Sequence, residues 1–369
     1  MYILKNRCKN EVSGKMKVGI ITFHFVNNFG GALQAYALQR IIEEEIDSEV
    51  EIIDYRNNFI RFTDMVRLFP VTKNVKEIIK GLKTFNKRIA RKDKFKKFTQ
   101  KNYNLSHKYS ASELSKISDI DVFVCGSDQI WNPTITLGLD KTYFLGFDTT
   151  AKKIAYAPSV GIDNLSKKNR SKIEKYLSDF SAVSVRENAA VSLIELMSNQ
   201  KVPQLIDPTF LLKTEDWDKV AIEPKYKKPY ILLYIMQLNS DVYNYAKKMK
   251  KKYGLPIVEI SRYGYKPDFV DYTLIDVGPA EFVGLFKNAA YVCTNSYHGL
   301  AFSLIYEKDF CLVPTKKYGI RMRSLLELFE IDNNDNSSLI LNYDKDKVKS
   351  IIECEKTKAI NFLIKNITD

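Results

Sequence analysis

The sequence has few of the residues that build disulfide or metal sites. It contains five cysteines and three histidines in 369 residues, and the cysteines show no paired spacing. Cys125, Cys293 and Cys311 lie within apolar runs, where cysteine acts as a small hydrophobic residue. We therefore expect no disulfide framework and no metal site, and a reduced, cytoplasmic chain.

Long apolar runs and common cofactor motifs are missing as well. No stretch reaches the roughly 18 uninterrupted apolar residues of a membrane span. The first fifteen residues lack the apolar core and cleavage site of a signal peptide, and we interpret residues 1–16 as an N-terminal extension. The absence of GxGxxG, Walker A and nucleophile-elbow motifs argues against a nicotinamide enzyme and predicts no bound cofactor.

Short apolar strands instead alternate with helix-length segments along the whole chain. This alternation is typical of parallel α/β units and predicts two Rossmann-like domains that face each other across a cleft. The predicted strands are 17–23, 49–55, 121–126, 153–158, 182–186 and 203–207 in the first half and 230–235, 257–261, 272–277, 291–294 and 309–314 in the second. The predicted helices include 31–45, 241–252, 279–288 and 299–306.

The same pattern gives domain boundaries. Hydrophobic residues make up 45% of the chain, which is enough for two hydrophobic cores. We expect an N-terminal domain over 17–207, a polar, proline-bearing linker over 208–229, a C-terminal domain over 230–335 and a helical tail over 336–369.

Positive charge is concentrated in a basic segment, residues 73–101, which we treat as a helical insert in the N-terminal domain. The net charge of the chain is +13, and this segment holds twelve Lys or Arg against Glu77 and Asp93. We favour a solvated lysine-rich helix that docks through its apolar stripe. The alternative is a basic amphipathic helix that lies on an anionic membrane. In that case the protein would be located at the inner face of the membrane. No nucleic-acid-binding motif accompanies the charge, so we expect no nucleic-acid partner. The stripe consists of Val75, Ile78, Ile79, Leu82, Phe85 and Ile89.

Four loops that follow predicted strands carry polar residues, and ligands of open parallel sheets bind at such strand ends. The glycine-rich first loop precedes a helix, so free N–H groups there suit a phosphate or carboxylate. The second loop places short polar groups beside a tryptophan, as in sugar recognition. The third has an arginine suited to bidentate anion binding, and the fourth has a histidine at a helix start. The residues are Asn28, Gly30 and Gly31; Ser127, Asp128 and Gln129; Arg186; and Asn295, Ser296 and His298.

Each loop also has an ordinary structural explanation. The first fits a plain helix entry, and the second fits an Asx-turn beside a core tryptophan. Arg186 fits a salt bridge with Glu187 or another carboxylate, and a lone histidine such as His298 is more often structural than catalytic. Lys316, Lys317, Arg321 and Arg323 offer further cations downstream, although most such lysines are merely solvated.

Taken together, the loops resemble the polysaccharide pyruvyl transferase family. Ordered motifs across roughly residues 17–330 carry the resemblance, among them "NNFGGALQAYALQ", "GSDQIWNP", "KKIAYAPSVG", "SVREN", "DPTFLL", "TNSYHGLAFSLIYEKDF" and "RMRSLLEL". The resemblance implies a GT-B-like pair of Rossmann-type domains. It also implies transfer of a pyruvyl ketal from phosphoenolpyruvate, as co-substrate, to a sugar of a bacterial surface polysaccharide or its lipid- or nucleotide-linked precursor.

The resemblance further implies roles for individual residues. Arg186 and His298 would hold phosphoenolpyruvate, with His298 as acid or phosphate contact, and Arg321 would be a third anion contact. Asp128, flanked by Ser127 and Gln129, would bind the acceptor or act as base.

The motif around the histidine differs from that of family members with established activity. Those members carry Arg-Leu-His where this chain has Ser296-Tyr297-His298. Arg321, Arg323 or Lys317 would have to supply the missing cation.

Two other functions fit the same residues. A GT-B glycosyltransferase that uses a nucleotide sugar would share the fold, with its diphosphate held by Arg186 and Lys317. A non-catalytic sugar-binding protein is the second alternative.

Overall fold

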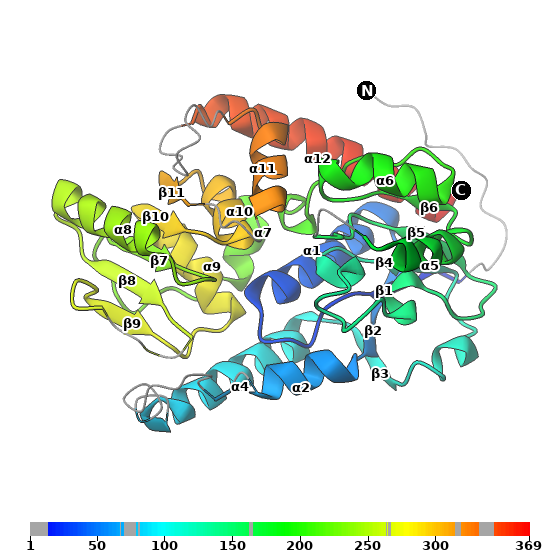
Figure 1. Ribbon diagram of the computed structural model, residues 1–369, viewed down its shortest axis with the longest axis horizontal. Coiled ribbons are helices and arrows are strands. Elements are labelled where there is room, and N and C mark those ends of the chain that lie inside the picture. The colour runs from blue at the N-terminus through cyan, green and yellow to red at the C-terminus, as the bar shows by residue number, and fades with distance from the viewer. Residues whose placement is uncertain are drawn as a thin grey trace.

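The structure is a computed structural model that describes residues 14–66, 68–69, 79, 82–161, 165–262, 264, 267–313, 319–331 and 343–369. Several residues discussed above lie outside the described residues. They are residues 1–13 of the expected extension, residues 70–78 and 80–81 in and just before the basic segment, and Lys316 and Lys317. The described chain forms two parallel sheets flanked by helices (Figure 1).

The N-terminal domain is built on a six-stranded sheet in the order β3-β2-β1-β4-β5-β6. All residues of its central strand β4 are buried, as expected for a strand covered on both faces. The strands are β1 (Lys17–Ile21), β2 (Glu49–Tyr55), β3 (Leu105–Tyr109), β4 (Val122–Cys125), β5 (Lys152–Ala155) and β6 (Ala182–Val183). The helices are α1 (Phe29–Ile46), α2 (Asn58–Val66), α4 (Phe85–Asn102), α5 (Lys167–Leu177) and α6 (Asn188–Ser198), with short 3-10 turns η1 (Leu114–Lys116), η2 (Gln129–Trp131) and η3 (Lys141–Phe144).

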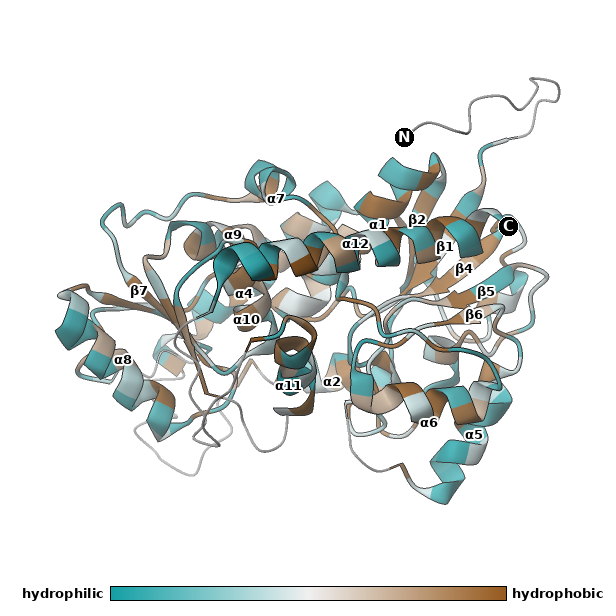
Figure 2. Cartoon of the chain, turned by 90° about the horizontal axis from the view of Figure 1, so that it is seen from above, coloured by the Kyte–Doolittle hydropathy of each residue, from teal (hydrophilic) through white to brown (hydrophobic). Residues whose placement is uncertain are grey.

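The C-terminal domain has a five-stranded sheet in the order β11-β10-β7-β8-β9. Strands β7, β8 and β10 are buried throughout, and Figure 2 shows the contrast between apolar strands such as β7 and the hydrophilic outer helix α8. The strands are β7 (Ile231–Tyr234), β8 (Ile257–Ile260), β9 (Tyr272–Leu274), β10 (Tyr291–Thr294) and β11 (Phe310–Leu312). The other elements are η4 (Pro208–Phe210), α7 (Thr214–Val220), α8 (Ser240–Tyr253), α9 (Pro279–Asn288), α10 (Tyr297–Ile305), α11 (Gly319–Leu328) and α12 (Lys345–Thr368).

These two sheets confirm the expected GT-B-like architecture of two Rossmann-like domains. In each sheet the strand order reverses beside the first strand, between β1 and β4 and between β7 and β10. Such switch points are where open α/β sheets bind ligands, because the loops that leave the strands diverge there. The loops chosen from the sequence follow three of these four strands.

Several helices tie the two domains together. Helix α12 returns from the C-terminal domain along the top of Figure 1 and packs on α1. The ring of Phe29 in α1 stacks on Phe282 of α9 with 4.3 Å between centroids. Lys94 of α4 forms a 2.8 Å ion pair with Glu281 of α9. The domain contact is therefore mainly helix against helix.

The segment 208–229 differs from the polar linker expected from its sequence. It contains η4 and α7, and the Trp217 side chain of α7 is fully buried. The indole packs against the rings of Tyr36 in α1 and Phe302 in α10. The many charged residues conceal an apolar helix face, which is why composition alone suggested a linker.

Two strand predictions also differ from the structure. Residues 203–207 form no strand, only an isolated bridge from Val185 to Gln204. The strand β3, by contrast, was not predicted. It lies at the edge of the sheet, where its polar sequence LSHKY is tolerated because one side is solvated.

Three described residues of the expected apolar stripe do not dock on the domain. Ile79, Leu82 and Ile89 are 49%, 60% and 42% exposed, while Val75 and Ile78 lie outside the described residues. Helix α4, which begins at Phe85, instead buries Phe95 and Phe98 against the rest of the domain. The spacing therefore identified apolar side chains but not the ones that the domain covers.

A cluster of three charged or titratable side chains joins the ends of β1 and β2, with His24 and Asp54 buried and Arg56 partly exposed. The carboxylate of Asp54 accepts hydrogen bonds from Arg56 Nε and Nη2 at 2.6 and 2.7 Å, and His24 Nε2 lies 3.1 Å from it. Burial alone would raise the pKa of Asp54, but the hydrogen bonds with His24 and Arg56 outweigh it and lower the pKa to about 2.

This depressed pKa predicts an acid-sensitive contribution to stability. The folded-state pKa lies below the ordinary value of 3.8, so the stabilisation is present at neutral pH and is lost as pH falls through the folded pKa. We expect Asp54→Asn to reduce the free energy of unfolding by about 2 kcal/mol at pH 7. The difference from the wild type should fall to about half near pH 3. Urea titrations of both proteins across this range measure it, and a difference independent of pH would contradict the prediction.

Candidate functional site

The carboxyl ends of strands from both sheets bring Asp128, Arg186 and His298 into one buried cluster. Asp128 follows β4, Arg186 follows β6, and His298 lies in the first turn of α10, directly after β10. The three side chains belong to loops that were chosen from the sequence, and their exposed fractions are 5%, 4% and 7%.

Arg186 is the centre of this cluster. Its Nη1 donates to Asp207 Oδ2 at 2.6 Å, and its Nη2 lies 3.7 Å from Asp128 Oδ1. The guanidinium carbon lies 4.6 Å from the centroid of the Tyr297 ring, a cation–π distance. Burial opposes its charge, but Tyr297 and the carboxylates of Asp207 and Asp128 prevail and raise the pKa of Arg186. The arginine therefore stays positively charged away from water.

Asp207 holds Arg186 in place, although sequence reasoning gave it no role. Its Oδ1 accepts hydrogen bonds from the backbone N–H and hydroxyl of Thr209 at 3.0 and 2.8 Å. His298 Nε2 lies 3.6 Å from Oδ2, too far for a hydrogen bond but within electrostatic reach. Burial would raise the pKa of Asp207, but His298 and Arg186 outweigh it and hold that pKa well below its usual range. In the sequence, the dipeptide Asp207-Pro208 at the end of an apolar run was the feature that could have pointed to Asp207 as a site residue.

Glycine at position 30 lets helix α1 of one domain approach His298 of the other. A Cβ at Gly30 would lie 2.0 Å from Nδ1 of His298, whereas a Cβ at Gly31 would have ordinary contacts, at 3.5 Å from Asp128 Oδ2. The sequence suggested free N–H groups at Gly30 and Gly31. In the structure both N–H groups donate to the side chain of Asn28, at 2.9 and 3.4 Å. An anion at this helix end would have to displace that cap.

Unsatisfied polar atoms gather in the cluster. Eleven buried side-chain nitrogen or oxygen atoms of the described residues have no hydrogen-bond partner, and five of them are here. Buried polar groups are normally paired, because leaving one unpaired costs about 1–3 kcal/mol. The concentration at one place indicates a ligand site. The five atoms are Arg186 Nε and Nη2, Glu187 Oε2, Tyr297 Oη and His298 Nε2.

A second arginine reaches the same place from α11. The guanidinium carbon of Arg321 lies 5.7 Å from the Tyr297 centroid, so Arg186 and Arg321 both contact this ring. Burial and the like charge of Arg186 lower the pKa of Arg321. The two guanidinium groups thus face one aromatic ring, and the buried carboxylates of Asp207 and Asp128 lie beside Arg186. Arg323, two residues further on, is exposed and lies outside the cluster.

The backbone of Asp128 is strained. Its φ of 72° with ψ of −177° is a conformation that only glycine adopts easily. The strained residue is held by the adjacent chain, since its carbonyl accepts the N–H of Ser159 at 2.8 Å. Strain of this kind persists where the surrounding structure enforces it, and it occurs mostly at functional sites.

The remaining predicted residues lie around the cluster but make internal contacts. The hydroxyl of Ser127 donates to the carbonyl of Ala157, and the amide oxygen of Gln129 accepts from Asn132. Asn295 clamps the loop after β7: it accepts from the Met236 N–H and donates to the Gln237 carbonyl. Ser296 is the N-cap residue of α10, without a side-chain cap bond. A role of these residues in binding stays a prediction.

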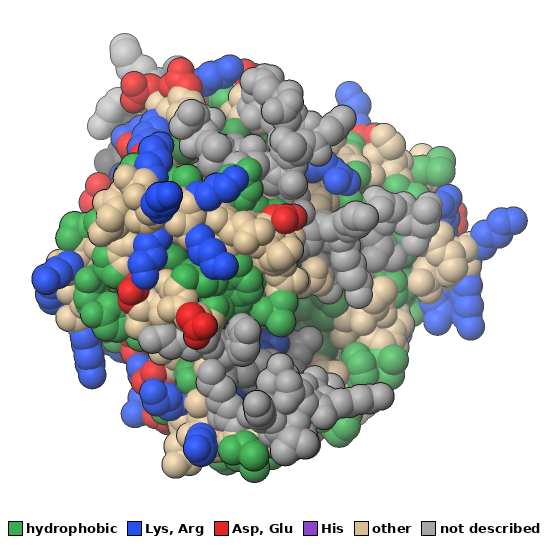
Figure 3. Space-filling model, turned by 60° about the vertical axis from the view of Figure 1, so that its left-hand side comes forward, with side chains coloured by type: hydrophobic (Ala, Val, Ile, Leu, Met, Phe, Trp, Pro, Cys, Tyr) green, Lys and Arg blue, Asp and Glu red, His purple; other side chains and the backbone are tan. Residues whose placement is uncertain are grey.

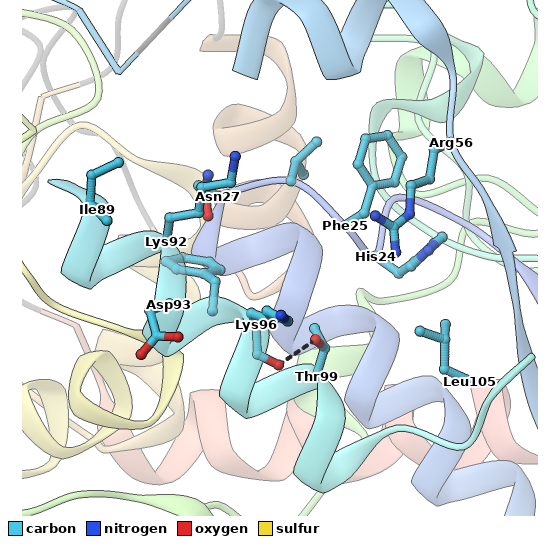
Figure 4. A pocket seen from close by; sticks show the side chains of 12 residues that line it. His24, Phe25, Asn27, Arg56, Ile89, Lys92, Asp93, Lys96, Thr99 and Leu105 are labelled. Carbon is cyan, nitrogen blue, oxygen red and sulfur yellow. Dashed lines mark hydrogen bonds between the residues drawn. The ribbon is translucent and has the colours of Figure 1, made fainter. Parts of the chain in front are cut away.

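A separate pocket of about 340 Å³ is lined in part by residues 24–27 of the first loop (Figure 4). His24, Phe25 and Arg56 line one side of it, and Lys92 and Lys96 of α4 line the other. Among the described residues, no carboxylate pairs with Lys92 or Lys96. The loop 24–31 thus contributes its first residues to the pocket and its last residues to the buried cluster.

These features define a two-domain α/β protein with a buried cluster of charged side chains between its domains. A family model described as polysaccharide pyruvyl transferase matches residues 28–316, and the chain belongs to that family. Membership makes it a transferase that acts in polysaccharide modification. No curated protein matches the chain significantly.

Solved structures match the chain over nearly its whole length, but only weakly. One is the Streptomyces sp. SF2575 glycosyltransferase SsfS6 complexed with thymidine diphosphate, at 11% identity and TM-score 0.43, with 94% of this chain and 98% of that chain covered. Another is the UDP-GlcNAc 2-epimerase from Methanocaldococcus jannaschii, at 15% identity and TM-score 0.41, with 92% of each chain covered. Similarity this low carries no functional argument.

The contact between α1 and His298 gives a test that needs no substrate. Gly30→Ala should reduce the free energy of unfolding by about 1–3 kcal/mol, because the added methyl overpacks the histidine. Gly31→Ala is the matched control, one residue along the same helix, and should change stability by less than about 1 kcal/mol. Chemical denaturation of both variants measures the difference, and equal effects would show that the close contact is absent in solution.

Proposed function

We propose that the protein transfers a pyruvyl ketal from phosphoenolpyruvate to a sugar acceptor of a cell-surface polysaccharide or its precursor. Family membership supports the transferase class. The observation that carries the choice of donor is the buried guanidinium of Arg186, whose Nε and Nη2 have no hydrogen-bond partner. A planar guanidinium with two open nitrogens suits bidentate binding of a carboxylate or phosphate, and phosphoenolpyruvate has both groups.

Arg321 would supply the second cation of the donor site. Two anionic groups on one small molecule require two cationic contacts, and Arg186 and Arg321 both lie against the Tyr297 ring. Ser296 and Tyr297 occupy the positions where other members have arginine and leucine, so Arg321 would approach from α11 in place of that arginine. The Tyr297 hydroxyl, which is buried without a partner, would donate to the same ligand.

The reaction needs an acid and a base on opposite sides of the enol carbon. A proton added to C3 makes C2 electrophilic, and an acceptor hydroxyl forms a bond to C2. The C2–O bond to phosphate then breaks, and a second hydroxyl closes the ketal. The two acceptor hydroxyls lose two protons in all. One of these balances the proton that the acid gave to C3, and the other leaves with phosphate. His298 would be the acid, and Asp128, 3.7 Å from Arg186, would be the base.

The acceptor would bind in the pocket beside α4. The first loop and the start of α1 connect this pocket to the donor site, because residues 24–27 line the pocket and Gly30 lies against His298. The pocket carries cations from two elements, Arg56 from the end of β2 and Lys92 and Lys96 from α4, together with the carboxylate of Asp93. Arg56 uses Nε and Nη2 to bind Asp54, which fixes its position at the pocket wall. A precursor that carries its sugar on a phosphate would find complementary charge there.

Binding of the donor would require the domains to separate. Arg186, Tyr297 and His298 are only 4%, 5% and 7% exposed, and Gly30 of the other domain covers His298. Closure after binding would exclude water from the electrophilic carbon, as in other enzymes whose domains close on substrate.

Phosphate release provides the direct test. The wild type should release inorganic phosphate from phosphoenolpyruvate in the presence of a nucleotide- or lipid-linked sugar, and His298→Asn and Arg186→Lys should each reduce the rate by about 100-fold or more. His107→Asn, an exposed histidine on β3, is the control and should retain wild-type activity. Melting temperatures separate lost chemistry from lost folding.

Other outcomes would favour the two alternative functions. If no acceptor elicits phosphate release and a nucleoside diphosphate stabilises the protein where phosphoenolpyruvate does not, the protein is a glycosyltransferase. If neither ligand is turned over and His298→Asn alters only stability, it is a binding protein.

The acceptor pocket predicts a selective kinetic effect. The double variant Lys92→Ala/Lys96→Ala should raise KM for a phosphate-bearing acceptor by about tenfold, because two charge-assisted contacts are lost. The KM for phosphoenolpyruvate should stay unchanged. Lys97→Ala, on the same helix but paired with Asp93 at 2.7 Å, is the matched control. Steady-state kinetics with each substrate varied in turn measure the KM for the acceptor and the KM for phosphoenolpyruvate separately. An equal rise of both KM values would contradict the assignment of this pocket to the acceptor.

A further inference from the structure

Exposed apolar side chains are concentrated on one part of the molecule. Of the fourteen large hydrophobic residues that are exposed in the described chain, seven lie between residues 62 and 89. Their exposed fractions range from 36% for Val66 to 60% for Leu82. We call these seven residues the α2–α4 apolar surface: Phe62, Met65, Val66, Phe69, Ile79, Leu82 and Ile89.

The segment after α2 meets the start of α4, and both helices lie near the lower edge of Figure 1. The ring of Phe69, just after α2, stacks on Phe85 at the start of α4 with 5.4 Å between centroids. Arg88 Nε donates to the carbonyl of Leu68 at 2.7 Å and closes the same junction. Helix α2 buries only Ile60, so most of its apolar side chains face outward.

Cations accompany the apolar surface. Arg61, Lys83, Lys87 and Lys92 are all exposed on or next to the two helices. The acidic residues nearby are engaged elsewhere: Asp64 accepts from the backbone and side chain of Asn27, and Asp93 pairs with Lys97. Lys and Arg side chains are also scattered over the face drawn in Figure 3, so charge alone would not single out this region. The combination of exposed aromatic and aliphatic residues with cations does.

We propose that the α2–α4 apolar surface docks on an anionic lipid bilayer. Interfacial helices insert apolar side chains at the level of the acyl chains while Lys and Arg contact the headgroups. A second copy of this chain fits less well, because a two-fold interface would place these cations opposite one another. Among the described residues no helix is long and apolar enough to cross a bilayer, so attachment would be peripheral.

The surface adjoins the pocket assigned to the acceptor. Ile89 lines that pocket and is also 42% exposed as part of the apolar surface. If the proposed function holds, this continuity selects a lipid-linked sugar phosphate as acceptor, whose lipid would stay in the bilayer while its phosphate reached Lys92 and Lys96. Docking itself does not depend on the reaction.

Vesicle flotation tests the docking. The full chain should float with vesicles of phosphatidylcholine and phosphatidylglycerol, but not with phosphatidylcholine alone. Phe62→Asp/Leu82→Asp, at positions 57% and 60% exposed, should reduce the floated fraction by about tenfold. The control is Leu196→Asp/Leu238→Asp, at positions 79% and 80% exposed but outside the surface, and should float like the wild type. Circular dichroism verifies the fold of both double variants.

Three results would overturn the proposal: no flotation with anionic vesicles, equal flotation of both double variants, or a dimer in light scattering that Phe62→Asp/Leu82→Asp abolishes. Phosphate release with a water-soluble acceptor, measured without vesicles, should be the same for the wild type and this variant. That assay separates a failure of docking from a failure of the proposed reaction.

Discussion

The buried ion pair between Arg186 and Asp207 is the interaction on which the centre of this protein depends. Removing two charges from water costs several kcal/mol per ion, and close pairing with extra hydrogen bonds from Thr209 offsets that cost. Apolar residues of the same size would serve stability at least as well. The pair instead keeps a guanidinium charged, oriented and incompletely satisfied between two domains, an arrangement that a bound anion would complete.

A steric constraint acts together with this electrostatic one. Helix α1 begins against the imidazole of His298, and only glycine at position 30 leaves room for the ring. The cluster is thus assembled from both domains, with Arg186 and Asp128 on one side and His298, Tyr297 and Arg321 on the other. A change in the angle between the domains would alter every distance in it, so the helix contacts of α1, α4 and α9 that fix this angle also determine the geometry of the site.

The basic segment shows what helical spacing can and cannot predict. The spacing that includes Ile79, Leu82 and Ile89 predicted a face that packs on the domain, but these three side chains are exposed. The side chains that pack against the domain core are Phe95 and Phe98, in a helix that begins only at Phe85. Likewise the charged composition around Trp217 suggested a linker, whereas the indole is buried between the domains. Local pattern identifies an amphipathic face but not the surface that covers it.

By itself the sequence determined the fold class and the loops that matter. Alternating apolar strands and helices are local features, and residues after parallel strands must gather at one edge of a sheet, so Asp128, Arg186 and His298 could be chosen together. Only the tertiary structure decided the partners. Asp207 and Tyr297, which were not selected from the sequence, became part of the centre because two separate sheets approach each other there, and for the same reason Gly30 lies against His298. The relative placement of two domains depends on many weak helix contacts at once, which no short motif encodes.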